Sequence, residues 1–440
     1  MREYTNRQRV MTRDRKKKPS VSTEKRSFSL RSLAVTAASV AVTAVLLTGC
    51  AGQEAESVSP EQTELRVVYS SGDANWKACL EDVAEKFMEE NPEISVELYT
   101  MGNYENRLYS DQLKILYAED EFYDVLELRE PQKVAEAGIL AEIPDAVEQL
   151  MDPARLSEEP VTYIPIYQMN RGMVYNKGVF QELGIREPGT YEEFLDACET
   201  LKEAGYNPVA VGGADLWHME FWGNFLFDNY MLDQDQQIQW TEENAEAMLR
   251  AFRSLYERGY VAEEYRDLSD NETAREIAAG NAAMLYTGAW MMPQITGMNP
   301  DVDLGYFFLP GPGGVRYAAQ DTSNCWGISQ KCAEDSEKYR AAERFLTFFY
   351  SEGIYENVLD TMTADSVVRR PVEESGLEAA RLVKEAYDEN VVATDQIISS
   401  LDTPGGFRNN YNRIMREALW GSRPIDELAA ELIALWQEER

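Results

Sequence analysis

Hydrophobic residues along the chain follow two alternating patterns, one typical of strands and one typical of helices. The apolar run at 65–69 leads into a turn, and 94–98 alternates apolar and polar residues, so both are expected to be strands. Between them, 76–90 places apolar residues at helical spacing until Asn91-Pro92 ends the pattern. A strand, a helix and a strand in this order predict an α/β fold with parallel neighbouring strands.

The same two patterns continue through the rest of the chain. Further strands are expected at 123–128, 163–177, 282–286 and 325–329. Helices are expected at 190–205, 241–259, 334–351, 372–389 and 424–438. The first of these helices has a capping box, in which Thr190 caps the first turn and Glu193 reaches back to it. The fold class is therefore α/β, with a helix-rich C-terminal part.

The first 49 residues have the pattern of a secretory signal peptide. Residues 1–31 are strongly basic, an uncharged apolar run follows at 33–47, and small residues precede a cleavage site. The apolar run is shorter than the about 20 residues that a transmembrane helix needs, which argues against the alternative of an uncut membrane anchor. We expect residues 1–49 to be absent from the mature protein.

The segment Leu47-Thr48-Gly49-Cys50 resembles the lipobox of bacterial lipoproteins. This resemblance implies that Cys50 is diacylated and becomes the mature N-terminus, and two acyl chains hold a protein firmly to a membrane. Residues 50–63 are polar and lack apolar periodicity, so they are expected to form a flexible tether. The protein is expected on the extracellular face of the cell membrane of a Gram-positive bacterium, where only the lipid anchor holds it.

The charge of the chain is strongly negative. Its 77 acidic and 42 basic residues give a net charge of −35 over 440 residues. The first 49 residues hold 11 of the basic and 3 of the acidic residues, so the remainder carries −43. A surface of this charge repels phosphate backbones and anionic lipids, which argues against nucleic-acid binding.

Cysteine and histidine are too scarce for the usual metal sites and nucleophilic catalytic sites. After Cys50 the cysteines are Cys79, Cys198, Cys325 and Cys332, with no C-x-x-C pair, and His218 is the single histidine. Cys79 and Cys198 fall on apolar helix stripes and are expected to be buried, whereas a bridge between the other two cysteines stays open. No G-x-S-x-G motif and no calcium loop occurs. Neither a metal nor a cofactor is predicted.

Several segments, taken in order, resemble one protein family. The matching segments are 123–140, 174–185, 188–195, 201–208, 279–290, 325–329 and 341–346. They span nearly all of residues 65–440 and are similar to the extracellular solute-binding proteins of ABC importers, in the branch that includes maltose-binding protein. The resemblance implies a two-lobed, type II periplasmic-binding-protein-like fold, in which hinge strands join the lobes and the lobes close on a ligand.

The same resemblance implies how the chain divides between the lobes. The N-lobe would hold 64–168 and 308–358, and the C-lobe would hold 174–305 and 362–440. The chain would cross between them near 166–173, near 306–309 and beyond Leu359. It would act as a monomeric receptor that performs no chemistry, and its closed form would dock on the ABC permease subunits.

Candidate ligand-binding residues follow from the rule that ligands in open α/β sheets lie at the carboxyl ends of strands. Sugar recognition needs aromatic faces for the apolar side of a pyranose, and amides, carboxylates or arginines for its hydroxyls. The residues that follow expected strands, or stand at the expected crossings and the C-terminal segment, include both kinds. They are Ser71, Asp73, Trp76, Arg129, Glu130, Gln168, Asn170, Asp215, Trp217, His218, Trp290, Asn324, Trp326 and Phe407.

Other interpretations of these residues stay open. Any single tryptophan can belong to the core, His218 can be a loop histidine with its hydrogen bonds satisfied, and Arg129 with Glu130 can form a surface ion pair of little energetic value. Trp290 stands out, because the resemblance places a sugar-stacking aromatic at Gly288-Ala289-Trp290.

The sequence thus favours a lipid-anchored, carbohydrate-binding receptor of an ABC importer. Two alternatives remain: a lipoprotein hydrolase that uses paired carboxylates on glycans, or the same fold presenting its ligand to a membrane sensor.

Overall fold

The computed structural model describes most of the chain that follows the tether. The described residues are 62–70, 73–102, 109–118, 122–156, 159–233, 237–388, 390–394 and 406–437. The chain divides into two units, Met1–Ser57 and Val58–Arg440, and every described residue belongs to the second. The signal peptide, Cys50, Ser71 and all but the end of the tether lie outside the described residues. Among the described helices, none combines the length and the apolar character that a membrane crossing requires.

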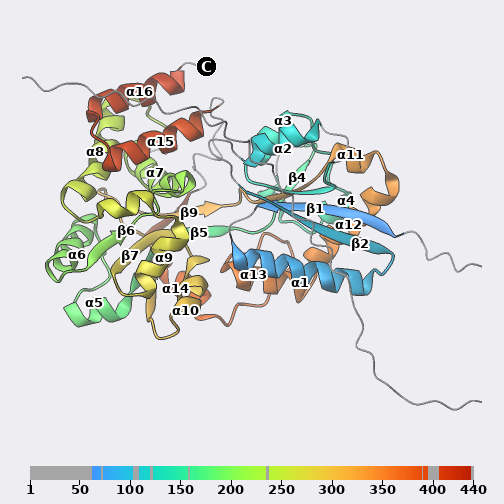
Figure 1. Ribbon diagram of the computed structural model, residues 1–440, viewed down its shortest axis with the longest axis horizontal. Helices are drawn as coiled ribbons and strands as arrows, with labels where there is room; N and C mark the ends of the chain where they lie inside the picture. Colours follow the sequence, from blue (N-terminus) through green and yellow to red (C-terminus); the bar gives the residue numbers. More distant parts are fainter. Residues whose placement is uncertain are drawn as a thin grey trace, which may run out of the picture. The chain divides into compact units, whose positions relative to one another are not determined.

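The first of two sheets has five strands (Figure 1). Their order is β2 (Ile94–Met101), β1 (Thr63–Ser70), β3 (Val125–Leu128), β10 (Cys325–Ile328) and β4 (Tyr163–Pro165). The strand β1 pairs in parallel with β2 and β3, whereas β10 is antiparallel to β3 and β4. The helix α1 (Ala74–Glu90) joins β1 to β2. The strand–helix–strand opening expected from the hydrophobic pattern is confirmed.

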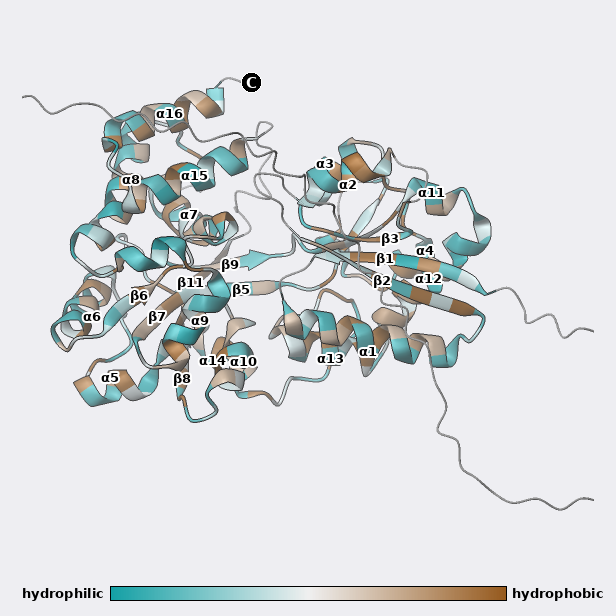
Figure 2. Cartoon of the chain, viewed as in Figure 1, coloured by the Kyte–Doolittle hydropathy of each residue, from teal (hydrophilic) through white to brown (hydrophobic). Residues whose placement is uncertain are grey.

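The helix α1 forms where its sequence supplies both a cap and an apolar stripe. The Asp73 carboxylate accepts hydrogen bonds from the backbone N–H groups of Asn75 and Trp76 at 2.8 and 3.1 Å, which satisfies two donors at the helix start. Leu80, Val83 and other apolar residues recur at helical spacing and are fully buried. Figure 2 shows the result as alternating hydrophilic and hydrophobic residues around the turns of α1.

Several helices accompany the first sheet, and we call this sheet with its helices the first lobe. They are α2 (Tyr109–Tyr117), α3 (Pro131–Glu136), α4 (Asp145–Glu148), α11 (Gln330–Ala333), α12 (Ser336–Phe349) and α13 (Ile354–Met362). Of these, α12 packs on β1 and α4, and α13 packs on α1. A short 3₁₀ helix also occurs at Pro153–Arg155.

The second sheet has six strands. Its main order is β11 (Val391–Thr394), β9 (Arg316–Asp321), β5 (Met169–Asn176), β7 (Ala282–Gly288) and β6 (Asn207–Ala210), and β8 (Leu304–Phe307) also pairs with β5. The strand β5 is antiparallel to β7, β8 and β9, whereas β6 and β7 run parallel. Every residue of β7 is buried, as expected for a strand covered on both faces.

We call the second sheet with its helices the second lobe. The helices are α5 (Lys177–Leu183), α6 (Tyr191–Glu203), α7 (Leu216–Tyr230), α8 (Glu242–Glu257), α9 (Asp270–Ala278), α10 (Met291–Met298), α14 (Glu378–Ala386), α15 (Phe407–Trp420) and α16 (Ile425–Gln437). A 3₁₀ helix occurs at Glu263–Asp267. The helices α7, α8, α15 and α16 pack against one another.

The chain passes between the two sheets at three places, and one of them differs from the expectation. The passages are 166–168 between β4 and β5, 322–324 between β9 and β10, and the stretch after α13 that leads to α14. The sequence predicted the second passage near 306–309, with an N-lobe segment beginning at 308. That boundary is wrong, because β9 pairs with β5 in the second sheet. The Pro- and Gly-rich loop at 309–314 suggested the end of a lobe but connects two strands of the same sheet.

Two helices and one strand of the second lobe were not predicted from the sequence. The helix α7 is buried on nearly all sides and therefore lacks an amphipathic stripe. The helix α15 follows residues outside the described part of the chain, and β11 lies just after the helix expected at 372–389. That helix is shorter than expected and spans Glu378–Ala386.

Candidate functional site

A hydrogen-bonded polar group lies at the carboxyl ends of β1 and β3. Arg129, which follows β3, donates from Nη2 to Ser70 Oγ at 2.5 Å and pairs with Glu127 Oε1 at 2.7 Å. Glu127 also accepts a hydrogen bond from the Ser70 backbone N–H at 3.0 Å. Because the carboxyl ends of parallel strands meet at one edge of the sheet, residues distant in sequence come together here.

The passage segments between the lobes complete this polar group. Arg129 Nη1 donates to Asn324 Oδ1 at 2.8 Å, and Asn324 Nδ2 donates to the Tyr167 hydroxyl at 3.1 Å. Burial raises the pKa of Tyr167, so its hydroxyl keeps its proton. We call Ser70, Glu127, Arg129, Tyr167 and Asn324 the polar group. The Arg129 side chain remains 33% exposed, and a ligand can therefore reach it.

Trp76 and Trp326 belong to the core of the first lobe. They are 1% and 0% exposed, and both rings pack against Phe349, at centroid distances of 6.4 and 5.5 Å. Trp76 Nε1 donates to Glu127 Oε2 at 3.0 Å, so Trp76 supports the polar group from below. The expectation that these two rings face a ligand is corrected here: other side chains enclose them.

The second lobe presents a group of aromatic rings. Trp217 and Phe221, both on α7, lie with their ring centroids 5.4 Å apart, and Phe221 meets Trp290 edge-on at 5.8 Å. His218 lies 5.4 Å from Phe221. Trp217 is half-buried and Trp290 is 8% exposed. We call Trp217, His218, Phe221 and Trp290 the aromatic group.

The end of β7 places the Trp290 ring. A Cβ atom on Gly288 would lie only 1.4 Å from Trp290 Cζ3, so the ring occupies space that any other residue at 288 would need. Trp290 itself begins the helix α10. The Gly-Ala-Trp sequence is thus the means by which the indole folds back over the end of a buried strand.

A buried ion pair lies next to the aromatic group. Arg171 on β5 and Asp321 at the end of β9 pair through Nη2 and Oδ2, and both side chains are 4% exposed. The Arg171 guanidinium carbon lies 4.3 Å from the centroid of the Phe221 ring. Burial would raise the pKa of Asp321, but Arg171 holds it below its usual value. Within the described residues, Nε and Nη1 of Arg171 have no hydrogen-bond partner.

His218 and Asp215 are held by contacts within the second lobe. His218 is fully buried, and its Nδ1 lies 2.5 Å from Asp270 Oδ1. Asp215 accepts a hydrogen bond from the Asp270 backbone N–H at 2.8 Å, and burial raises the pKa of Asp215. Both residues support the start of α7, which carries the rings of the aromatic group.

Gln168 and Asn170 tie the passage segments to one another. The backbone N–H of Gln168 donates to the Asp365 carbonyl at 3.0 Å, and the reverse bond measures 2.8 Å. Asn170 Nδ2 donates to Asp365 Oδ2 at 2.7 Å, and Tyr387 donates its hydroxyl proton to Asn170 Oδ1 at 2.7 Å. Two of the three passages are therefore hydrogen-bonded side by side, at the position expected of a hinge.

Asp73 and Glu130 contact the second lobe directly. Gln294 Nε2 on α10 donates to Asp73 Oδ2 at 3.3 Å. Arg408 Nη1 on α15 lies 3.5 Å from Glu130 Oε1. The sequence identified the two acids, because they follow strands of the first sheet. It missed their partners, because Arg408 lies on an unpredicted helix and Gln294 follows no strand directly.

Phe407 is not part of this arrangement. It is 1% exposed, and its ring packs against Trp240 at 5.5 Å, Trp436 at 5.5 Å and Tyr411 at 5.9 Å. The expectation of a ligand-facing aromatic from the C-terminal segment is corrected here, since Phe407 joins the helices of the second lobe. Ser71, the remaining predicted residue, lies outside the described residues.

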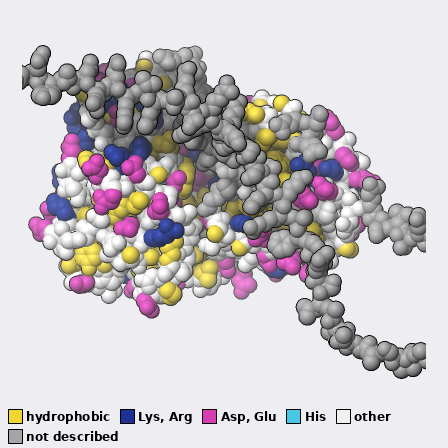
Figure 3. Space-filling view, in the orientation of Figure 1, with side chains coloured by type: hydrophobic (Ala, Val, Ile, Leu, Met, Phe, Trp, Pro, Cys, Tyr) yellow, Lys and Arg dark blue, Asp and Glu magenta, His cyan; other side chains and the backbone are white. Residues whose placement is uncertain are grey.

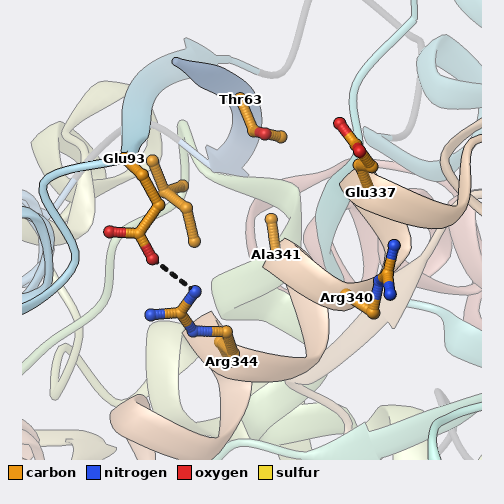
Figure 4. A pocket seen from close by; sticks show the side chains of 7 residues that line it. Thr63, Glu93, Glu337, Arg340, Ala341 and Arg344 are labelled. Atoms are coloured by element: carbon orange, nitrogen blue, oxygen red, sulfur yellow. Dashed lines mark hydrogen bonds and ion pairs between the residues drawn. The ribbon is translucent and has the colours of Figure 1, made fainter. Parts of the chain in front are cut away.

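The most pronounced hollow lies elsewhere and does not fit a binding site of this fold. It has a volume of about 340 Å³ and is lined by Thr63, Glu93, Ile94, Glu337, Arg340, Ala341 and Arg344. Figure 4 shows it between α12 and the amino ends of β1 and β2, with Arg344 paired to Glu93 at 2.6 Å. Ligands of α/β sheets bind at the opposite, carboxyl ends of the strands.

The described residues also answer the questions of metal and disulfide. No group of three or more His, Cys, Asp or Glu side chains placed to hold a metal occurs in the part of the chain that the structure covers. Cys79, Cys198, Cys325 and Cys332 are buried and unbridged in the structure. Figure 3 shows Asp and Glu side chains spread over the visible face, interspersed with Lys and Arg.

Comparison with known proteins bears on this geometry. The model of a family described as bacterial extracellular solute-binding protein matches residues 74–356. The multiple sugar-binding protein of Streptococcus mutans is 21% identical over 324 residues, which cover 68% of this chain and 75% of that protein. The melibiose/raffinose/stachyose-binding protein of Bacillus subtilis is 23% identical over 334 residues, covering 69% and 74% respectively.

A solved structure supports the same fold. The sugar transporter from Bacillus licheniformis, crystallised in complex with stachyose, superposes with a TM-score of 0.71 at 17% identity and covers 86% of this chain and 100% of that chain. The expected α/β, two-sheet fold of the periplasmic-binding-protein type is confirmed by this likeness.

Proposed function

We propose that this chain, which belongs to the bacterial extracellular solute-binding protein family, binds an oligosaccharide between its two lobes and delivers it to an ABC importer. Members of that family are solute-binding receptors and not enzymes, so the expectation of a binding protein is confirmed and the alternative of a glycan hydrolase is set aside. The nature of the solute is the part that we propose.

The observation that carries the proposal is the division of side chains between the lobes. The aromatic group offers ring faces to the apolar C–H side of a pyranose, and the polar group offers a guanidinium and an amide to its hydroxyls. Arg171 adds two donors without partners in the described residues, beside Phe221. Asp73 and Glu130 come from the first lobe and meet the second.

The roles follow from position. Trp290 and Trp217 stack on sugar rings, while Arg129 and Asn324, already oriented by Ser70 and Tyr167, donate to or accept from hydroxyls. His218 and Asp215 hold the start of α7 in place. Gln168 and Asn170 serve the hinge through Asp365.

The relatives support an oligosaccharide as the ligand class. One is a multiple sugar-binding protein, a second binds melibiose, raffinose and stachyose, and a structure of the same fold holds stachyose. These ligands are larger than a monosaccharide. A site with several rings and several polar groups fits a ligand with more than one sugar unit.

The cellular setting of the receptor is also part of the proposal. The lipobox supports lipidation of Cys50, and residues 50–63 would tether a monomeric receptor to the extracellular face of the membrane beside its permease. An acidic chain repels anionic lipids, which keeps the two lobes away from the bilayer surface and leaves the lipid as the anchor.

Calorimetric titration of the purified protein with a panel of mono- and oligosaccharides tests the proposal. We expect heat of binding with at least one neutral oligosaccharide of two to four units, and weaker binding of its monosaccharides. A folded protein that gives no heat with any sugar of the panel would contradict the proposal.

A further inference from the structure

Three charged side chains join the two lobes at α15. Arg408 lies in the first turn of α15 in the second lobe, and its Nε pairs with Glu220 Oε2 on α7. Its Nη1 lies 3.5 Å from Oε1 of Glu130, which precedes α3 in the first lobe. The side chains of Arg408, Glu220 and Glu130 are 16%, 2% and 3% exposed. The cluster is thus almost fully enclosed by protein.

Only one of the two ion pairs crosses between the lobes. Arg408 and Glu220 belong to helices that pack together in the second lobe, so their pair does not depend on how close the lobes are. The contact with Glu130 forms only where the first lobe meets the second. Separation of the lobes would therefore break the Glu130 contact and leave the Glu220 contact intact.

Each charge keeps a partner when the crossing contact breaks. Glu130 accepts hydrogen bonds from Lys133 Nζ at 2.8 Å and from the Ser110 hydroxyl, both in the first lobe. Arg408 retains Glu220, which also accepts from Asn412 Nδ2 at 3.3 Å. A buried charge without a partner is strongly destabilising, and neither state leaves one behind. The contact can therefore form and break reversibly.

The guanidinium also separates two like charges. Burial would raise the pKa of Glu130, but Arg408 and Lys133 hold it below its usual value, so Glu130 is ionised near neutral pH. Burial likewise opposes the charge on Arg408, and Glu220 and Glu130 raise its pKa nonetheless. Without Arg408, carboxylates from opposite lobes would face each other and favour separation.

We propose that Arg408 is a positioning residue for ligand-induced closure, because it bridges Glu220 and Glu130 only when the lobes are together. This inference rests on the proposed function, in which the closed lobes enclose the sugar. The apparent affinity of such a receptor scales with the fraction of protein in the binding-competent state. By stabilising the closed state, Arg408 raises sugar affinity without touching the sugar.

The test compares two arginines on the same helix. Arg408→Gln removes the contact between the lobes, whereas Arg413→Gln removes pairs with Glu417 and Glu431 that lie within the second lobe. We expect Arg408→Gln to weaken binding of the best neutral oligosaccharide by about 5- to 30-fold, within the range of coupling between sites. Arg413→Gln should stay within about twofold of the parent, as for an exposed pair.

A second readout separates closure from local structural damage. Labels on Glu89→Cys in α1 and Ala247→Cys in α8, both exposed positions, report the distance between the lobes, while the four described cysteines are buried. We expect Arg408→Gln to lower the closed fraction of the sugar-free protein and to reach the parent distance at saturating sugar. Arg408→Lys should restore part of the closed fraction.

Glu130→Gln covers the case in which Arg408→Gln fails to fold. It keeps the size of the side chain and removes only the charge on the other side of the contact, and it should lower the closed fraction in the same direction. Unchanged distance and affinity in both variants would overturn the inference. If the parent binds no sugar at all, the proposed function fails, while the sugar-free distances still decide whether Arg408 holds the lobes together.

Discussion

The strand ends of the first lobe and those of the second lobe present different chemistry to the same space. In the first lobe, Arg129 and Asn324 are fixed by a chain of hydrogen bonds that runs from Ser70 to Tyr167. In the second lobe, Trp217, Phe221 and Trp290 meet through their rings. One lobe therefore supplies directional contacts with a fixed geometry, and the other supplies apolar area that tolerates different sugars.

This difference teaches how a single fold can bind different sugars. A ring face recognises most pyranoses, so the aromatic group provides affinity with little selectivity. The polar group recognises the directions of hydroxyls and therefore distinguishes one sugar from another. Substitutions in the two lobes should accordingly differ in kind, and the predictions below exploit that difference in order of expected size.

The largest effect is expected where charge is buried beside the aromatic group. Asp321→Asn leaves the Arg171 guanidinium buried with no carboxylate partner, and loss of one member of a buried pair costs about 3–5 kcal/mol of unfolding free energy. Urea unfolding followed by circular dichroism measures this loss. The matched control is Asp388→Asn, which removes an exposed partner of Arg316 and should cost less than about 1 kcal/mol. Equal losses in the two variants would contradict the assigned role of the buried pair.

The same variant predicts a pH dependence with a definite sign. Because the pKa of Asp321 is lowered in the folded state, its carboxylate stabilises the fold fully above the unfolded pKa of about 4, and that contribution is lost as pH falls through the folded pKa. The difference in unfolding free energy between the parent and Asp321→Asn should therefore shrink below about pH 4. A difference that grows on acidification would have the wrong sign.

A smaller effect, on binding and not on folding, is expected at Trp290. Trp290→Ala removes a stacking face and should weaken oligosaccharide binding by about 1–3 kcal/mol, the usual cost of truncating a buried aromatic anchor. Calorimetric titration measures this change. Trp290→Phe keeps a ring and should recover part of the affinity, and an alanine variant that binds like the parent would remove Trp290 from the site.

The smallest effect is expected at the neutral contact between the lobes. Gln294→Ala removes one hydrogen bond to Asp73 at 3.3 Å, and Asp73 keeps its two bonds to the start of α1. We expect less than about a fivefold loss of affinity, in keeping with about 1 kcal/mol for a typical hydrogen bond. A loss larger than that of Arg408→Gln would mean that α10, and not α15, holds the lobes together.

The sequence predicted the outline of the fold because its strands and amphipathic helices keep their own periods. The opening strand–helix–strand unit and the buried strand β7 follow directly from the pattern. The boundary near 308 failed because β9 has a mixed polar pattern after a Pro- and Gly-rich loop. The helix α7 escaped because burial on nearly every side removes the stripe that marks a helix.

The strand-end rule found part of the candidate site and misplaced the rest for one physical reason. It fixes the position of a residue along a strand but not the face of the sheet from which the side chain projects. Arg129 and Asn324 project into the polar group, whereas Trp76 and Trp326 project into the core under α12. Glu127 was missed because a single acid inside an apolar strand carries no positional signal.

The indole N–H resonances of the tryptophans test the central claim most directly, because they report on both kinds of position in one titration. Addition of a bound oligosaccharide should shift the resonances of Trp217 and Trp290. Those of Trp240 and Trp436, whose rings stack on each other at 4.4 Å among the C-terminal helices, should stay unchanged. Saturable binding that leaves Trp217 and Trp290 unmoved would contradict the account.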